Sequence, residues 1–171
     1  MARLLMVIPP ERFRDEELFE TKAALEEAGH QIAIASTKTG PCPGSRGGTA
    51  TAAVMLGDAK IDNYDGVIFV GGGGSKLLFN NPDAHKIARD MEHCGKIVAA
   101  ICLAPVILAN AGILKGRKAT VAGTEAKTIT EKGATYTGPG VTVDRKIVTA
   151  NGPKSSKLFG QEIASLLVCR N

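Results

Sequence analysis

The segment around Cys102 has the pattern of a reactive cysteine held on a sharp turn. The apolar run 96–101 (KIVAAI) predicts a buried strand, and residues 104–111 predict a short apolar helix soon after Cys102. A nucleophile elbow needs small residues two positions before and after the nucleophile, and Ala100 and Ala104 stand there. The amides at the start of the helix would point at the sulfur, so we expect them to lower the pKa of the thiol. The alternative is a buried cysteine that serves only as a small apolar side chain.

A run of glycines forms a second candidate site. Gly71–Gly74 follows the expected strand 66–70 and precedes Ser75. The third glycine of a dinucleotide-binding G-x-G-x-x-G motif would fall on Lys76, and no Gly-Lys-Ser/Thr of a P-loop follows. The run can still present backbone N–H groups as an anion nest or an oxyanion hole, or it can be a flexible turn. A phosphate- or nucleotide-binding module built on these residues is therefore a third functional possibility.

The other residues that could carry chemistry have simpler explanations. Asp15, Glu16 and Glu17 begin an expected helix over 15–28, where acidic side chains complement the helix dipole. None of the three histidines adjoins Cys102 in the sequence, and we expect all three at the surface. Cysteine and histidine spacings typical of metal sites do not occur, so we expect no metal and no cofactor.

Composition limits the class of protein. The chain has 171 residues, of which 44% are apolar and 22% charged, which suits one globular domain spanning residues 1–171. Four cysteines are too few for a disulfide scaffold. The net charge is −2 over residues 1–114 and +6 over residues 115–171. No aromatic residues interleave with the basic side chains to stack bases, so we interpret the basic part as solvated surface and expect no nucleic-acid partner.

The ends of the chain and its hydropathy predict a cytoplasmic protein. The opening apolar run stops at Pro9-Pro10 and has no small-residue cleavage site of a signal peptide. No stretch approaches the roughly 18 apolar residues of a membrane helix, so we expect no membrane contact. The other three cysteines lack the strand, small neighbours and helix that surround Cys102. Cys42 is in a Gly/Pro-rich loop, Cys94 is at a helix end and Cys169 is near the terminus.

Strands and helices are expected to alternate along the chain, with strands at 3–8, 31–36, 66–70, 96–101 and 118–122 and a hairpin at 141–149. Helices are expected at 15–28, 82–94, 104–111, 125–132 and 153–168, and residues 39–49 are expected to be a loop. This order predicts an α/β fold with a mostly parallel sheet covered on both faces, whose sites lie at the carboxyl ends of the strands.

The apolar spacing also predicts which helical residues face the core. The expected inward side chains are Leu18, Phe19, Ala23, Leu25 and Ala28 on the first helix and Leu158, Phe159, Ile163, Leu166 and Leu167 on the last. We expect Asp15 to cap the first helix and Gly29 to end it.

Over nearly its whole length the chain resembles the DJ-1/PfpI (ThiJ/PfpI) superfamily. Residues 95–105 (GKIVAAICLAP) are similar to the elbow A-I-C-x-G/A-P of that family, and residues 13–18 (FRDEEL) match its acidic start of the first helix. Gly71-Gly72 resembles its Pro-Gly-Gly at a strand end. Residues 114–118 and 151–153 match two further landmarks.

The resemblance implies a fold and a site. The fold would be a flavodoxin-like three-layer α/β/α sandwich of the class I glutamine amidotransferase-like type, usually a homodimer or a higher homo-oligomer. Cys102 would be the reactive nucleophile, and Glu17 falls where the family keeps a carboxyl group beside the sulfur. The backbone N–H groups of Gly72 and Leu103 would form the oxyanion hole.

The sequence departs from the family at the imidazole partners of the nucleophile. Leu103 stands where the protease-like branch has histidine, and the stretch 120–123, where the DJ-1-like branch places its histidine, has none. Val70 replaces the proline before the glycine pair. These departures count against a Cys–His protease and leave Cys102 and Glu17 as the pair within the chain.

Two functions follow from the resemblance. The first is a cysteine-dependent hydrolase or glyoxalase/deglycase-like enzyme acting on small electrophilic carbonyl compounds or amides, with a small molecule as substrate. The second is a non-enzymatic, redox-responsive stress or chaperone-like protein in which Cys102 is oxidised.

Overall fold

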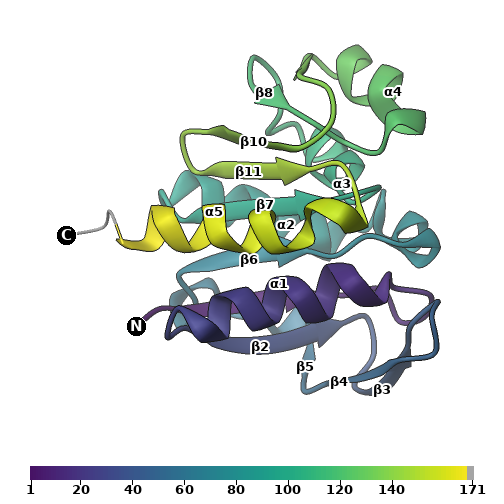
Figure 1. The fold of residues 1–171 in the computed structure, drawn as a ribbon, viewed down its shortest axis with the longest axis vertical. Helices are drawn as coiled ribbons and strands as arrows, with labels where there is room; N and C mark the ends of the chain where they lie inside the picture. The colour runs from purple at the N-terminus through teal and green to yellow at the C-terminus, as the bar shows by residue number, and fades with distance from the viewer. Residues whose placement is uncertain (169–171) are drawn as a thin grey trace.

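A seven-stranded sheet forms the centre of the protein, as seen in a computed structural model that describes residues 1–168 (Figure 1). Its strand order is β10-β11-β7-β6-β1-β2-β5, and all neighbours are parallel except β10 and β11. The strands are β1 (Arg3–Val7), β2 (Gln31–Ser36), β5 (Val54–Met55), β6 (Gly66–Phe69), β7 (Ile97–Ile101), β10 (Val141–Asp144) and β11 (Ile147–Ala150).

Helices cover both faces of this sheet. Helices α1 (Asp15–Glu27) and α5 (Ser156–Val168) pack side by side on one face, and α2 (Pro82–His93) and α3 (Pro105–Asn110) lie on the other (Figure 1). Successive side chains of β1 alternate between the two cores: Leu4 and Met6 join one and Leu5 and Val7 the other. The predicted α/β sandwich with a mostly parallel sheet is thus confirmed.

Short elements complete the chain. They are helix α4 (Ala126–Glu131) and the 3₁₀ turns η1 (Leu56–Asp58), η2 (Ile61–Asn63), η3 (Gly73–Leu78), η4 (Gly123–Glu125) and η5 (Pro153–Ser155). No helix within residues 1–168 is long and apolar enough to cross a membrane.

Two stretches differ from the sequence-based prediction. The expected loop at 39–49 contains β3 (Gly40–Pro43), which pairs with β4 (Thr49–Ala52) as an antiparallel hairpin. The expected strand at 118–122 stops at Ala119, as β8 (Lys118–Ala119) paired with β9 (Thr135–Tyr136). It stops there because the next amide, that of Thr120, donates to the side-chain oxygen of Thr149 and not to a strand backbone.

The predicted faces of the outer helices are partly wrong. On α1, Leu18 and Leu25 are buried as expected, but Phe19 is 41% exposed, and Ala23 and Ala28 are also exposed. In their place Glu17 and Thr21 point inward. Thr21 donates to the Ser156 carbonyl at 3.2 Å and Glu17 Oε1 accepts from the Gly71 amide at 3.0 Å, so the buried stripe of the helix is rotated away from its most apolar one.

Helix α5 shows a smaller error of the same kind. Phe159, Ile163 and Leu167 are buried and Leu166 is partly buried, but Leu158 is 48% exposed. Cys169 lies outside the described residues.

Candidate active site

Cys102 lies on the turn between β7 and α3, in a conformation that L-residues rarely adopt. Its φ is 66°, a left-handed backbone angle that costs about 1–2 kcal/mol for a residue with a side chain. Both of its backbone groups are held: the amide donates to the Ala150 carbonyl at 2.9 Å, and the carbonyl accepts from Ala122 at 2.7 Å. Ala100 and Ala104 are fully buried beside the turn. This is the geometry of a nucleophile elbow.

Glu17 brings a carboxyl group to the sulfur from α1. Its side chain is fully buried, and Oε1 accepts a hydrogen bond from the Gly71 amide at 3.0 Å. The Cys102 thiol lies near enough to affect the pKa of this carboxyl group. Oε2 is buried without a hydrogen-bond partner among residues 1–168. Burial raises the pKa of Glu17 to about 7, against the opposing effects of the Cys102 thiol and the Gly71 amide.

The glycines after β6 are a tightly packed part of the site. A Cβ on Gly71 would lie 2.6 Å from Glu17 Oε1 and 2.7 Å from the Cβ of Cys102. Gly72 has a φ of 102°, and its carbonyl accepts hydrogen bonds from the Ser75 hydroxyl at 2.7 Å and the Ser75 amide at 3.0 Å. The run is therefore not a flexible turn. The amides of Gly72 and Leu103 lie on the side of the Cys102 sulfur, where they favour its ionised form.

The expected low pKa of the thiol is wrong. Burial and the neighbouring Glu17 carboxyl group together raise the pKa of Cys102 to about 12. The Gly72 and Leu103 amides lower the pKa of the thiol, but by less. A thiolate beside an ionised Glu17 is disfavoured, so the pair favours states that hold one proton between the two groups.

The three histidines have structural surroundings of their own. The His30 ring accepts from the Ala2 amide at 3.0 Å, and the His85 ring lies 2.8 Å from the Phe79 carbonyl oxygen. These two side chains are half-buried, so only His93 is exposed as predicted. Within residues 1–168, no group of three or more His, Cys, Asp or Glu side chains could hold a metal ion.

Asp15 does not cap α1 as predicted, although Gly29 ends the helix in the expected left-handed conformation (φ 94°). The Asp15 carboxylate accepts from the Arg46 amide at 3.0 Å and the Gly48 amide at 2.7 Å, both in the β3–β4 turn. This role of Asp15 was not predicted, and neither was the hydrogen bond of the Ser75 hydroxyl to the Gly72 carbonyl. An acidic residue followed thirty residues later by a Gly/Ser-rich turn gives no local signal of such a contact.

A cavity of about 560 Å³ opens between the start of α1 and the loop that follows β11. It is lined by Arg14, Glu16, Glu20 and residues 151–154. Its two walls adjoin the elbow, because the Arg14 amide donates to the Gly71 carbonyl at 3.0 Å and Asn151 follows Ala150, which holds the Cys102 amide.

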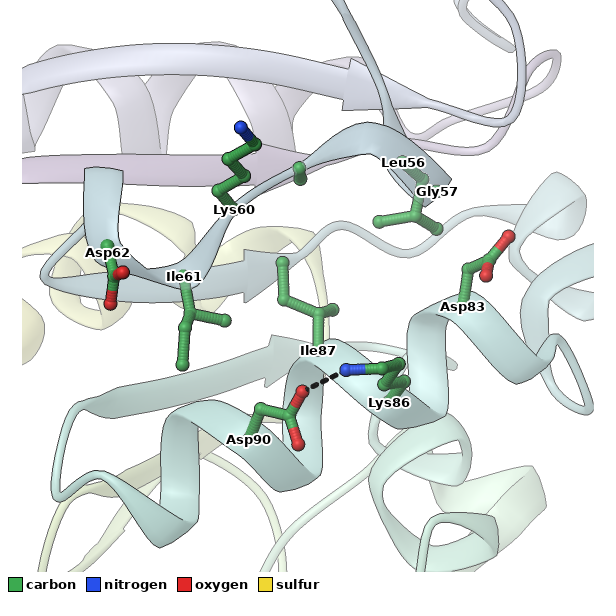
Figure 2. Close-up of a pocket in the computed structure, with 10 residues that line it drawn as sticks. Leu56, Gly57, Lys60, Ile61, Asp62, Asp83, Lys86, Ile87 and Asp90 are labelled. Carbon is green, nitrogen blue, oxygen red and sulfur yellow. Dashed lines mark hydrogen bonds and ion pairs between the residues drawn. The ribbon is translucent and has the colours of Figure 1, made fainter.

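A second cavity, of about 270 Å³, lies between α2 and the segment of η1 and η2 (Figure 2). Asp83, Lys86 and Asp90 of α2 line one side of it and Lys60 and Asp62 the other, with the Lys60 side chain extending away from α2. Lys86 pairs with Asp90 at 2.6 Å. None of its lining residues belongs to the elbow, the glycine run or α1.

The fold and the site together define a class: parallel α/β sandwiches with a cysteine on a nucleophile elbow and a carboxyl group beside it. Within this class, residues 2–166 match the DJ-1/PfpI family. The chain belongs to the DJ-1/PfpI family.

Known proteins similar to the chain agree with this assignment. An uncharacterised protein of Methanocaldococcus jannaschii is 42% identical over 99% of this chain and 84% of its own length. A protein of Pyrococcus furiosus named deglycase PfpI is 31% identical over 95% of this chain and 98% of its own. The crystal structure of a ThiJ/PfpI domain protein from Brachyspira murdochii superposes with a TM-score of 0.97 at 32% identity, covering 99% of this chain and 98% of that one.

Proposed function

We propose that the protein is a cysteine-dependent enzyme of deglycase, glyoxalase or hydrolase type that acts on small electrophilic carbonyl compounds or amides. The observation that carries the proposal is the fully buried Glu17 carboxyl group, with a pKa of about 7, beside Cys102 on its strained turn. A carboxyl group with such a pKa can both accept and return a proton near neutral pH. The deglycase names of family relatives support the same reaction class.

The chemistry starts from the state in which the Cys102–Glu17 pair has lost one proton. The sulfur attacks the carbonyl carbon of the substrate and forms a C–S bond, while the thiol proton passes to Glu17 and the C=O electron pair moves onto oxygen. That oxygen would lie against the Gly72 and Leu103 amides, which serve as the oxyanion hole. Protonated Glu17 then returns its proton to the alkoxide, or to a leaving amine as the C–N bond breaks and a thioester forms. Water from solvent hydrolyses the thioester, which breaks the C–S bond, releases the carboxylic acid and restores the Cys102 thiol. No step requires an imidazole.

The direct test is turnover of methylglyoxal, and of its adducts with free amino acids, by Cys102→Ser. We expect turnover to be lost and the circular dichroism spectrum to be unchanged. Cys94→Ser is the matched control, because Cys94 is an exposed free cysteine at the end of α2. Full activity of Cys102→Ser would overturn the assignment of the nucleophile.

The same geometry supports a second candidate function, a redox-responsive protein. Two equivalents of peroxide would convert the Cys102 thiol into a sulfinic acid with release of two waters, and a protonated Glu17 would donate a hydrogen bond to the sulfinate. Intact-mass measurement after mild peroxide should then show a gain of two oxygens that Cys102→Ser lacks. Such a gain without any carbonyl turnover would favour this function over the enzyme. The expected homodimer and cytoplasmic location stay predictions.

A further inference from the structure

We propose that the cavity between α1 and the loop after β11 binds a carboxylate group of the substrate through Arg14, so that the site prefers carbonyl compounds that carry a carboxylate. The inference rests on the proposed function, because Cys102 is taken as the group that attacks the carbonyl carbon. It goes further by naming the substrate class, which includes 2-oxo acids and carbonyl adducts of free amino acids.

The Arg14 guanidinium has one edge engaged and one edge available. Its Nε and Nη2 atoms donate to the two oxygens of Glu16 at 2.8–3.2 Å. Within residues 1–168 the hydrogen bonds of this side chain all go to Glu16, and none of them uses Nη1. The Nη1–Nη2 edge is the fork that binds a carboxylate with two parallel hydrogen bonds. The Arg14 side chain is 28% exposed and lines the cavity, so a ligand can reach this edge.

Glu16 holds the fork in place. A bidentate ion pair along one edge of a guanidinium fixes the plane of the whole group, so little side-chain entropy is lost when the other edge binds a ligand. The backbone of Arg14 is fixed as well, since its amide donates to the Gly71 carbonyl at 3.0 Å.

The Arg14 guanidinium and the Cys102 sulfur interact electrostatically. The pKa of Arg14 is raised first by its hydrogen bond to Glu16, and further by the charges of Glu16, Glu17 and Cys102. We expect a carboxylate bound to the outer edge of Arg14 to leave the rest of a small molecule near the elbow. The geometric reason is that the Arg14 amide donates to the Gly71 carbonyl and Gly71 lies against Cys102, with no room for a side chain between them.

The charges around the cavity nearly cancel. Arg14 and Lys154 are positive and Glu16 and Glu20 are negative. A diffuse positive field is therefore absent from the cavity wall, and selectivity for a carboxylate must come from the direction of the Arg14 donors. This distinction makes arginine and lysine unequal at position 14.

Alkylation of Cys102 tests the inference without requiring turnover. Iodoacetate and iodoacetamide alkylate the same sulfur with loss of iodide, and they differ only in carrying a carboxylate or a neutral amide. Site-resolved mass spectrometry gives the rate at Cys102 apart from the other cysteines. We expect Arg14→Gln to lower the ratio of the iodoacetate rate to the iodoacetamide rate about tenfold at pH 7. Dividing the two rates cancels any change in thiol reactivity.

Two further variants complete the experiment. Lys127→Gln removes the same charge from a side chain that is 90% exposed on α4, and we expect it to leave the ratio unchanged. We expect Arg14→Lys to lose most of the preference. A ratio unchanged in Arg14→Gln, or fully restored in Arg14→Lys, would overturn the inference. If the ratio behaves as expected while wild-type protein turns over no carbonyl compound, the proposed function fails and the carboxylate subsite stands.

Discussion

Cys102 and Glu17 face each other inside a site that contains no described imidazole, so their chemistry depends on how the pair shares a proton. Burial raises the pKa of both groups, Glu17 raises the pKa of Cys102 further, and Cys102 in turn lowers the pKa of Glu17. The two groups therefore titrate as a pair. The first loss is governed by the group with the lower pKa, Glu17. Removal of the carboxyl group should therefore change the pH at which the sulfur becomes reactive.

We expect the alkylation rate of Cys102 by iodoacetamide to rise with a midpoint near pH 7 in the wild-type protein, because the pKa of Glu17 is about 7. In Glu17→Gln no base accepts the thiol proton. Burial still raises the pKa of the thiol above its ordinary 9.0, so the midpoint should move above pH 9. The control is Glu20→Gln, whose side chain is exposed one turn away. A midpoint near 7 in Glu17→Gln would remove Glu17 from the mechanism.

A substitution at Gly72 tests whether its backbone amide contributes to the site. A Cβ at this position would lie 2.5 Å from the Arg12 carbonyl oxygen and 2.5 Å from the Arg14 amide. Gly72→Ala should therefore cost more than the about 1–2 kcal/mol of left-handed strain alone, and turnover should fall because the amide at position 72 shifts. Gly29→Ala has a similar φ of 94° with open space around the Cβ, so it should show only the strain. Urea denaturation and turnover measure both effects, and equal destabilisation would contradict the crowding argument.

Among the elements, the sequence was sufficient for the buried strands and insufficient for the faces of the outer helices. The runs that became β1, β6 and β7 are apolar on both sides, as strands covered on both faces must be. The buried stripe of α1 is different, because long-range polar contacts decide it. Thr21 donates to the Ser156 carbonyl at 3.2 Å, and Glu17 accepts from the Gly71 amide at 3.0 Å. No apolar periodicity contains this information.

The β3–β4 hairpin was missed for a related reason. Its residues are rich in Gly and Pro, and what orders them is the segment before α1. The Arg12 amide donates to the Pro43 carbonyl and the Ser45 amide to the Phe13 carbonyl, both at 2.8 Å. The cysteine and the glycines of the site could be predicted because each is marked by its own neighbours along the chain. The thiol pKa could not, since burial and Glu17 decide it.

Asp15 should stabilise this hairpin. Asp15→Ala removes two charge-assisted hydrogen bonds to the Arg46 and Gly48 amides, so we expect a loss of about 1–3 kcal/mol in the free energy of unfolding. Hydrogen exchange should speed up first in residues 44–48. The control is Asp62→Ala in η2, where the side chain is exposed. Unchanged exchange at the Arg46 and Gly48 amides would contradict the anchoring role.

For the molecule as a whole, Glu17 is the one fully buried carboxyl group among residues 1–168. The rest of the two cores is aliphatic or aromatic apart from a few hydroxyl groups. Burying one ionisable group between two apolar layers couples the site to global stability, because ionising that group costs more in the folded protein than in the unfolded chain.

This coupling predicts that the free energy of unfolding falls as pH rises from about 4.5 to 8. The pKa of Glu17 in the folded protein, about 7, lies above its ordinary value of 4.5. The folded state therefore binds the proton more tightly, and this advantage is lost as pH rises through 7. At about 1.4 kcal/mol for each pH unit of difference, the full effect is about 3 kcal/mol. His30 acts in the opposite sense, since burial and the N-terminal charge lower its pKa and its contribution is lost as pH falls.

Subtracting the curve of Glu17→Gln from that of the wild-type protein removes the contribution of His30, because both proteins contain it. Urea denaturation at half-unit pH steps should give a difference that declines from pH 4.5 to pH 8, with its steepest change below pH 7. Between pH 4.5 and pH 8 the variant should therefore gain stability relative to the wild-type protein, because its glutamine has no charge to bury. Glu20→Gln, exposed on the same helix, should give a flat difference. A flat difference for Glu17→Gln would mean that the folded protein ionises Glu17 as readily as the unfolded chain does, and the proton held between Glu17 and Cys102 could then not serve catalysis near neutral pH.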